Sequence, residues 1–176
     1  YRKVFAARGI KHEFGPRLTI VQVFNRCLEF PAEFYGEVND DHVYRTDGWD
    51  LKLARAIQGN GGWGMAHGRT ENQAGAVLIS ANCVRALGYF FPPCFRHQYG
   101  DTALTDLYSS AGLALAVADV WIEHMHPFFG KAVLDATYAP MLGAGEADRL
   151  AYEKWKAEDF ETDLDKLSPG ILCRQS

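Results

Sequence analysis

The sequence predicts an α/β domain in which a mixed sheet is flanked by helices. Short apolar segments that favour strands alternate along the chain with segments in which apolar residues recur at helical spacing. Hydrophobic residues make up 48% of the 176 positions and aromatic residues 13%, which is enough for one compact core. The chain has no internal repeat and no low-complexity segment. We therefore expect residues 1–176 to form a single domain.

The charge and the cysteines exclude several classes of protein. The formal net charge is −4 and no run of Lys or Arg stands out, so nucleic acid is not an expected partner. The longest apolar run, residues 112–122, is interrupted by Asp119 and is too short for a transmembrane segment. The four cysteines form no Cys-x-x-Cys pair, which favours a reducing, cytoplasmic setting over a zinc or disulfide framework.

The first third of the chain predicts a helix followed by a strand. Pro16 suits the first position of a helix, and the apolar residues after it recur at helical spacing over residues 17–30. Pro31 ends this helix. The apolar segment Phe34–Val38 is then expected to form a strand.

The middle of the chain predicts a second helix and two further strands. Asp47 is an expected N-cap for a short helix that Gly59 closes. Residues 63–67 and, more strongly, residues 76–80 are expected strands. The second of them leads directly into a helix that ends at Gly88.

The last part of the chain predicts a helix, a strand and a terminal helix. Asp101 is placed to cap a helix over residues 102–111, and residues 113–120 are apolar and compatible with a strand. Residues 146–167 are expected to form one charged amphipathic helix, whose charged side faces solvent.

The first group of candidate site residues is the sequence Asn-Asp-Asp-His at residues 39–42, directly after the expected strand. The adjacent carboxylates of Asp40 and Asp41 repel each other, and a divalent cation is the most effective offset for that repulsion. If Phe34–Val38 is an inner strand, the pair lies at its carboxyl end, where open α/β sheets bind ligands. The alternative is that both residues simply cap a loop.

A second polar group follows much later in the chain. Asp101 opens a helix, and capping alone would explain an aspartate there. Strand alternation puts His124 and His126 on the same face, as two ligands, or a ligand and a phosphate contact, would require. A histidine buried in the core is the alternative for either position.

Five motifs in a fixed order then carry a resemblance that no single motif would carry. They are Asn-Asp-Asp-His at 39–42, Thr-x-Gly-Trp-Asp at 46–50, Leu-Gly-Tyr-Phe-x-Pro-Pro at 87–93, His-x-Tyr-x-Asp at 97–101 and Glu-His-x-His-Pro-x-x-Gly-Lys at 123–131. In this order the chain resembles the family 2-type glycosyltransferases of the GT-A fold, over roughly residues 15–165. The resemblance is to the bacterial and phage-associated branch, and it implies a Rossmann-like mixed sheet.

The resemblance also implies a metal site and a donor site. The acidic motif of that family binds a divalent metal and the diphosphate of a nucleotide sugar, which makes Asp41 a ligand of Mn²⁺ or Mg²⁺. A late histidine often completes such a site, and His124 is the expected second ligand. Asp40, His126 and Lys131 match positions that contact the donor.

The implied activity is transfer of a sugar from a nucleoside-diphosphate sugar to a hydroxyl acceptor. A carboxylate at the start of a helix on the acceptor side commonly serves as general base in that family, which points to Asp101. Two other functions remain open from the residues: a non-catalytic sugar- or protein-binding module that retains the fold, and a metal hydrolase using positions 40, 41, 124 and 126.

The chain departs from the family in two respects. Its acidic motif is Asn-Asp-Asp where the family has a spaced Asp-x-Asp. Only about 38 residues precede the acidic pair, so we expect much of the nucleoside-binding unit to be absent. Either the sequence is truncated at its N-terminus, or another subunit supplies the missing part, or the protein is a reduced form that no longer turns over. We also expect an uncovered sheet edge near residues 1–11, and hence a homo-oligomer.

Overall fold

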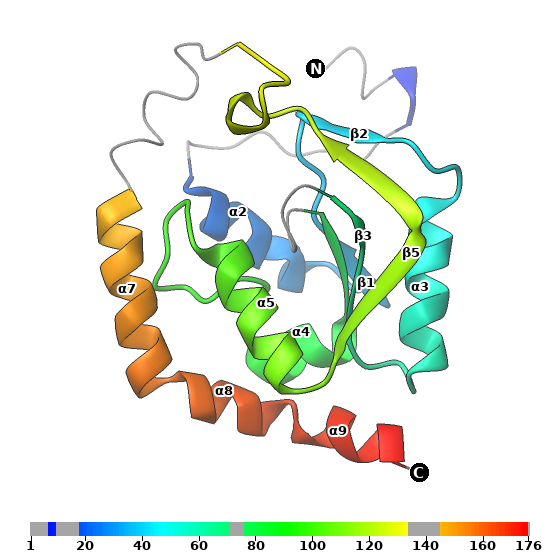
Figure 1. The fold of residues 1–176 in the computed structure, drawn as a ribbon. Coiled ribbons are helices and arrows are strands. Elements are labelled where there is room, and N and C mark those ends of the chain that lie inside the picture. The colour runs from blue at the N-terminus through cyan, green and yellow to red at the C-terminus, as the bar shows by residue number, and fades with distance from the viewer. Residues whose placement is uncertain (1–6, 10–17, 71–75, 134–144, 176) are drawn as a thin grey trace.

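The computed structural model describes residues 7–9, 18–70, 76–133 and 145–175. These residues form a mixed α/β fold with a curled sheet and helices on both of its faces, as expected (Figure 1). The edge expected near residues 1–11 falls almost wholly outside the described residues. Within the described residues, no helix combines the length and the apolar composition needed to cross a bilayer.

The sheet contains five strands in the order β1-β4-β3-β5-β2. Their bounds are Phe34–Gly36 for β1, His42–Tyr44 for β2, Met65–Arg69 for β3, Val77–Ser80 for β4 and Ala114–His124 for β5. Strands β3 and β5 are parallel, and the other three neighbouring pairs are antiparallel. The three strands expected in the middle and last parts of the chain are therefore confirmed, with β5 longer than expected.

The strand that delivers the acidic motif lies at the end of the strand order of the described residues, so the condition of an inner strand is not met there. Among the described residues β1 pairs with β4 alone, from Phe34 opposite Ser80 to Gly36 opposite Leu78. The next strand along the chain, β2, lies at the other end of the strand order. The connection over residues 37–41 can span at most about 20 Å, so the sheet must curl until its two edges approach each other.

An irregularity in β5 allows this curl. Residues His67 and Arg69 of β3 pair with Ala116 and Trp121 of β5, so β5 has several extra residues at this point. Gly68 lies inside the irregularity, and a Cβ atom there would be 2.6 Å from Cγ1 of Val120. Only glycine allows the two strands to approach so closely, and beyond this point β5 leaves β3 and pairs with β2.

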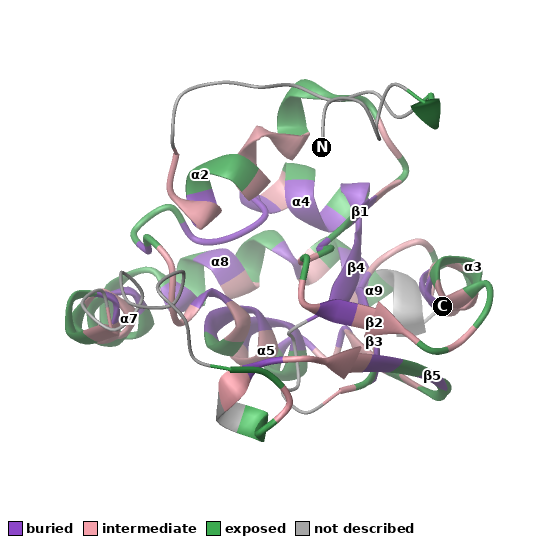
Figure 2. Ribbon diagram, turned by 90° about the horizontal axis from the view of Figure 1, so that it is seen from above, coloured by how far each residue is buried: buried purple, intermediate pink, exposed green. Residues whose placement is uncertain are grey.

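Alternating side chains of the strands separate two hydrophobic cores. On one face, Ala66 and Leu78 pack against α3 (Trp49–Gly59), which buries Leu53 and Ile57 completely. On the other face, the strands pack against α2 (Ile20–Asn25), α4 (Ala81–Leu87) and α5 (Gly100–Ser110). Figure 2 shows buried residues in β4 and α4 and in parts of α5, whereas most of β5 is exposed or partly exposed.

Several helix ends differ from expectation. The expected helix over residues 17–30 is α2 followed by a 3-10 turn, Arg26–Glu29, and it begins with a capping box between Thr19 and Gln22. Helix α3 is capped by Gly48 in the left-handed conformation, so Asp47 is not its cap. Helix α4 is confirmed, with the Ser80 side chain as its cap.

The expected single helix over residues 146–167 is wrong. The chain forms α7 (Gly145–Glu158) and α8 (Phe160–Lys166), followed by α9 (Ser168–Gln175), which together run along the outside of the molecule (Figure 1). The break lies at Asp159. It turns the chain so that Trp155 and Phe160 both enter the core, where their rings meet edge to face with centroids 5.3 Å apart.

Candidate functional site

The end of the β2–β5 ladder brings an aspartate and two histidines together. His42 of β2 lies opposite His124 of β5, and the two ring centroids are 4.7 Å apart. Nε2 of His124 is 3.1 Å from Oδ2 of Asp41, although 83 positions separate the two residues in the chain. The closeness of Asp41 and His124 that the resemblance implies is thus present.

The backbone holds this turn in place. The amide of Met125 donates to the carbonyl of Asp41 at 2.7 Å, which extends the ladder by one residue beyond β2. The amide of His42 donates to the carbonyl of Asn39 at 3.2 Å, which closes the turn through the acidic pair. Asp41 is half-buried while its neighbour Asp40 is exposed, so the two adjacent carboxylates face different surroundings.

Three side chains come close enough together to form a candidate cation site. Asp41, His42 and His124 each offer one ligand atom, and these atoms lie within 4.8 Å of one another. Two ligand atoms that are each about 2.1 Å from one ion, at roughly a right angle, are about 3 Å apart. The contact between Asp41 and His124 matches that separation. One carboxylate and two imidazoles suit Mn²⁺ or another transition metal better than Mg²⁺, which prefers oxygen ligands.

His126 lies beside this group but just past the end of β5. Its ring centroid is 5.1 Å from that of His124, so the two histidines do share one side of the chain. Burial lowers the pKa of His126, as does the nearby His124, while Asp41 raises it. The 3-10 turn Pro127–Phe129 follows, and the ring of Phe129 packs against both histidines.

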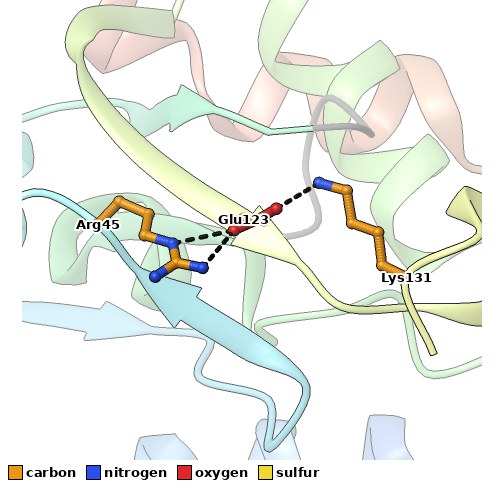
Figure 3. Close-up of polar contacts among 3 residues, drawn as sticks. All are labelled: Arg45, Glu123 and Lys131. Carbon is orange, nitrogen blue, oxygen red and sulfur yellow. Dashed lines mark hydrogen bonds and ion pairs between the residues drawn. The ribbon is translucent and has the colours of Figure 1, made fainter.

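Glu123 occupies the opposite face of the ladder, because side chains alternate along a strand. It accepts hydrogen bonds from Nε and Nη2 of Arg45 at 2.9 and 2.7 Å and from Nζ of Lys131 at 2.7 Å (Figure 3). The contact with Lys131, followed by that with Arg45, lowers the pKa of Glu123. Lys131, an expected donor contact, therefore forms an ion pair with Glu123.

Glu37 is a site residue that sequence reasoning missed. Its side chain is buried, and burial raises its pKa to about 8, with further contributions from the charges of Asp101 and Asp41. Oε1 accepts a hydrogen bond from Nδ2 of Asn39 at 2.9 Å, which lowers the pKa and is the second-largest influence after burial. Alternation from the buried Tyr35 would have predicted that Glu37 also points inward.

Asp101 lies in the first turn of α5, where Tyr99 is the N-cap, so the expected capping role of Asp101 is wrong. Its Oδ1 instead accepts from the amide of Thr102 at 2.8 Å. The charge of Asp101 also contributes to the raised pKa of Glu37. The loop that leads to it is anchored by Asp148, whose carboxylate accepts from the amides of residues 96–98.

The second missed residue is His42, which sequence reasoning quoted within its motif without assigning it a role. Its closeness to His124 depends on the pairing of β2 with β5, which the sequence does not reveal.

No family model, no curated protein and no solved structure matches the chain. The residues quoted above therefore carry the resemblance to glycosyltransferases by themselves.

Proposed function

We propose that this protein is a divalent-metal-dependent glycosyltransferase that moves a sugar from a nucleoside-diphosphate sugar to a hydroxyl acceptor. The observation that supports it best is the contact between Asp41 and His124, which joins two motifs of the resemblance across the β2–β5 ladder. A single site formed by two motifs that are distant in sequence requires them to lie close together in space, as these do.

The metal would be held by Asp41, His42 and His124. These residues fit a divalent cation by their number, by their ligand atoms and by their spacing, and the two imidazoles favour Mn²⁺. A bound divalent cation would neutralise the charge that develops on the departing nucleoside diphosphate. His126, whose lowered pKa favours the neutral ring, is placed beside the metal group and can donate one hydrogen bond to a phosphate oxygen.

Asp101 would remove the proton of the acceptor hydroxyl. As that oxygen forms a bond to the anomeric carbon, the bond from this carbon to the diphosphate oxygen breaks, and the diphosphate leaves with the electron pair. The proton of the acceptor ends on Asp101.

A metal hydrolase is the second candidate, and a specific observation favours it. Two histidines and one aspartate around one ion also form the usual ligand set of hydrolytic sites that activate a water molecule. The two functions differ in their acceptor. The transferase requires a sugar donor and a hydroxyl acceptor, whereas the hydrolase would cleave a phosphoester or an amide with water.

Calorimetric titration of the purified chain tests the metal and the donor together. We expect Mn²⁺ to bind and UDP or GDP to bind only when Mn²⁺ is present. Asp41→Asn should weaken Mn²⁺ binding at least tenfold, because it removes the only carboxylate of the three ligands. Asp40→Asn is the matched control: it removes the same charge from the adjacent, exposed position and should leave Mn²⁺ binding within about threefold.

Each alternative has a distinct result. Binding of nucleotide that is equal with Mn²⁺ and with EDTA would exclude the metal-dependent mechanism. Turnover of p-nitrophenyl phosphate without any sugar acceptor would favour the hydrolase. If Asp40→Asn and Asp41→Asn weaken Mn²⁺ binding equally, the carboxylate of Asp41, which contacts His124, has no special role in holding the metal.

A further inference from the structure

Glu37 is a buried carboxyl group that the proposed mechanism does not use. Only 6% of the residue is exposed, and it follows β1 directly, just before the acidic turn. One oxygen, Oε1, accepts a hydrogen bond from Nδ2 of Asn39. The other, Oε2, is buried and has no hydrogen-bond partner among the described residues.

A buried carboxyl oxygen without a hydrogen bond lowers the stability of the fold unless a ligand supplies the missing partner. A buried polar atom that forms no hydrogen bond destabilises the folded state, because it has lost its hydrogen bonds to water and gained none in the protein. The next residue, Val38, is 59% exposed, so the chain here buries a carboxyl group and leaves an apolar side chain in solvent. Packing alone would favour the reverse, so Oε2 is held for a partner that the described residues do not supply.

The position of Glu37 indicates the kind of partner. The charges of Asp41 on the metal side and of Asp101 on the base side both act on its carboxyl group. In a glycosyl transfer, the sugar lies between the metal-bound diphosphate and the catalytic base. Sugar hydroxyl groups both donate and accept hydrogen bonds, so they can satisfy a carboxyl oxygen in either of its protonation states.

We propose that Oε2 of Glu37 forms a hydrogen bond with a hydroxyl group of the sugar that this site binds. The hydrogen bond to Asn39 fixes the orientation of the carboxyl group, because it holds Oε1 and leaves Oε2 for the ligand. This inference rests on the proposed function and specifies which side chain recognises the sugar. Glu37 is then a specificity-determining residue for the sugar part of the donor, separate from the residues that hold the metal.

The experiment separates the sugar from the nucleotide. The Kd values of UDP, GDP, UDP-glucose, UDP-galactose, UDP-N-acetylglucosamine and GDP-mannose are measured by calorimetry with Mn²⁺. We expect at least one sugar nucleotide to bind the wild-type chain more tightly than its parent diphosphate. Glu37→Met should weaken that sugar nucleotide about tenfold or more while the parent diphosphate changes less than about threefold, because the variant loses the hydrogen bond to the sugar and leaves the contacts of the diphosphate in place.

Two further variants control for the fold. Glu37→Gln retains an oxygen for Asn39 and replaces the second oxygen with an amide, so it should retain the parent diphosphate and change the preference among the sugars. Val38→Thr alters the adjacent, exposed side chain and should change neither Kd. Thermal unfolding of each variant, compared with the wild type, identifies any loss of fold.

The outcomes distinguish this proposal from the proposed function. If the wild-type chain binds sugar nucleotides and both Glu37 variants retain the full preference for sugar over diphosphate, the role of Glu37 is overturned and the glycosyltransferase proposal stands. If the wild-type chain binds none of the six compounds with Mn²⁺, both proposals are overturned. Loss of the diphosphate together with the sugar nucleotide in a folded Glu37→Gln variant would assign Glu37 to the metal group and overturn its role toward sugar.

Discussion

Three buried carboxyl groups in this chain differ in how completely the protein itself satisfies them. Asp148 of α7 accepts three backbone N–H groups, and Asp163 of α8 accepts from Trp155, Lys166 and the hydroxyl of Tyr89. Glu37 accepts one hydrogen bond, from Asn39. The two aspartates join the C-terminal helices to the rest of the fold, whereas Glu37 lies beside the candidate site with one oxygen unused.

The comparison teaches that burial alone does not indicate the role of a charged group. A buried carboxylate that accepts three donors stabilises the fold, because its desolvation is offset by charge-assisted hydrogen bonds. A buried carboxyl group with one donor is a source of instability that a ligand can relieve. Stability measurements should therefore separate Asp148 and Asp163 from Glu37.

The largest effect is expected for Asp148→Ala. It leaves the amides of residues 96–98 without their acceptor, and the loss of three hydrogen bonds to a charged group should lower the free energy of unfolding by about 4 kcal/mol. Urea unfolding monitored by circular dichroism measures it. Asp148→Asn retains one acceptor oxygen and should lose roughly half as much. A loss below about 1 kcal/mol for Asp148→Ala would refute its role as an anchor.

The next effect is a dependence of stability on pH that originates from Glu37. The pKa of Glu37 is raised from its ordinary value of 4.5 to about 8 in the folded chain. Its contribution to stability is therefore fully present at a pH below 4.5 and is lost as the pH rises through 8. In EDTA, the free energy of unfolding should fall by roughly 2–3 kcal/mol between pH 5 and pH 9, the full value being reduced as water enters around the ionised group.

Glu37→Gln is the control for this pH dependence, because it removes the titrating group and keeps the hydrogen bond with Asn39. The difference in stability between wild type and variant should therefore shrink or reverse in favour of the variant as the pH rises. A difference that stays constant from pH 5 to pH 9 would mean that Glu37 is as well accommodated when ionised as the two aspartates are.

The smallest effect is expected for Asp163→Asn. The variant can still accept from Nε1 of Trp155 through its carbonyl oxygen but loses its charge toward Lys166, so we expect a loss of about 1–2 kcal/mol in urea unfolding. Lys166→Met separates the partly buried ion pair from the fully buried contacts and should cost about 1 kcal/mol or less. If the Asp163→Asn variant is as stable as the wild type, then the charge of Asp163 does not stabilise the fold, and Asp163 resembles Glu37 in this respect.

Sequence patterns predict best those helices and strands whose ends are set by residues only a few positions away in the chain. The strand β4 and the helix α4 were predicted with nearly correct bounds, because an apolar run, a Ser80 cap and a C-terminal Gly88 all act within a few positions. The expected caps Asp47 and Asp101 were wrong because glycine and tyrosine in the left-handed conformation precede those helices instead. A residue type that favours the N-cap therefore does not by itself determine where a helix begins, because tertiary packing also decides this.

From the sequence by itself we predicted that a late histidine, His124 or His126, lies near Asp41, because the order of motifs carries the resemblance without knowledge of the strand pairing. Only the tertiary structure decided that β1 lies at an edge and that the sheet curls at Gly68. That curl pairs β2 with the end of β5 and adds His42 to the group. Strand pairing joins residues distant in the chain through backbone hydrogen bonds that every residue but proline can form, so side-chain patterns do not specify it.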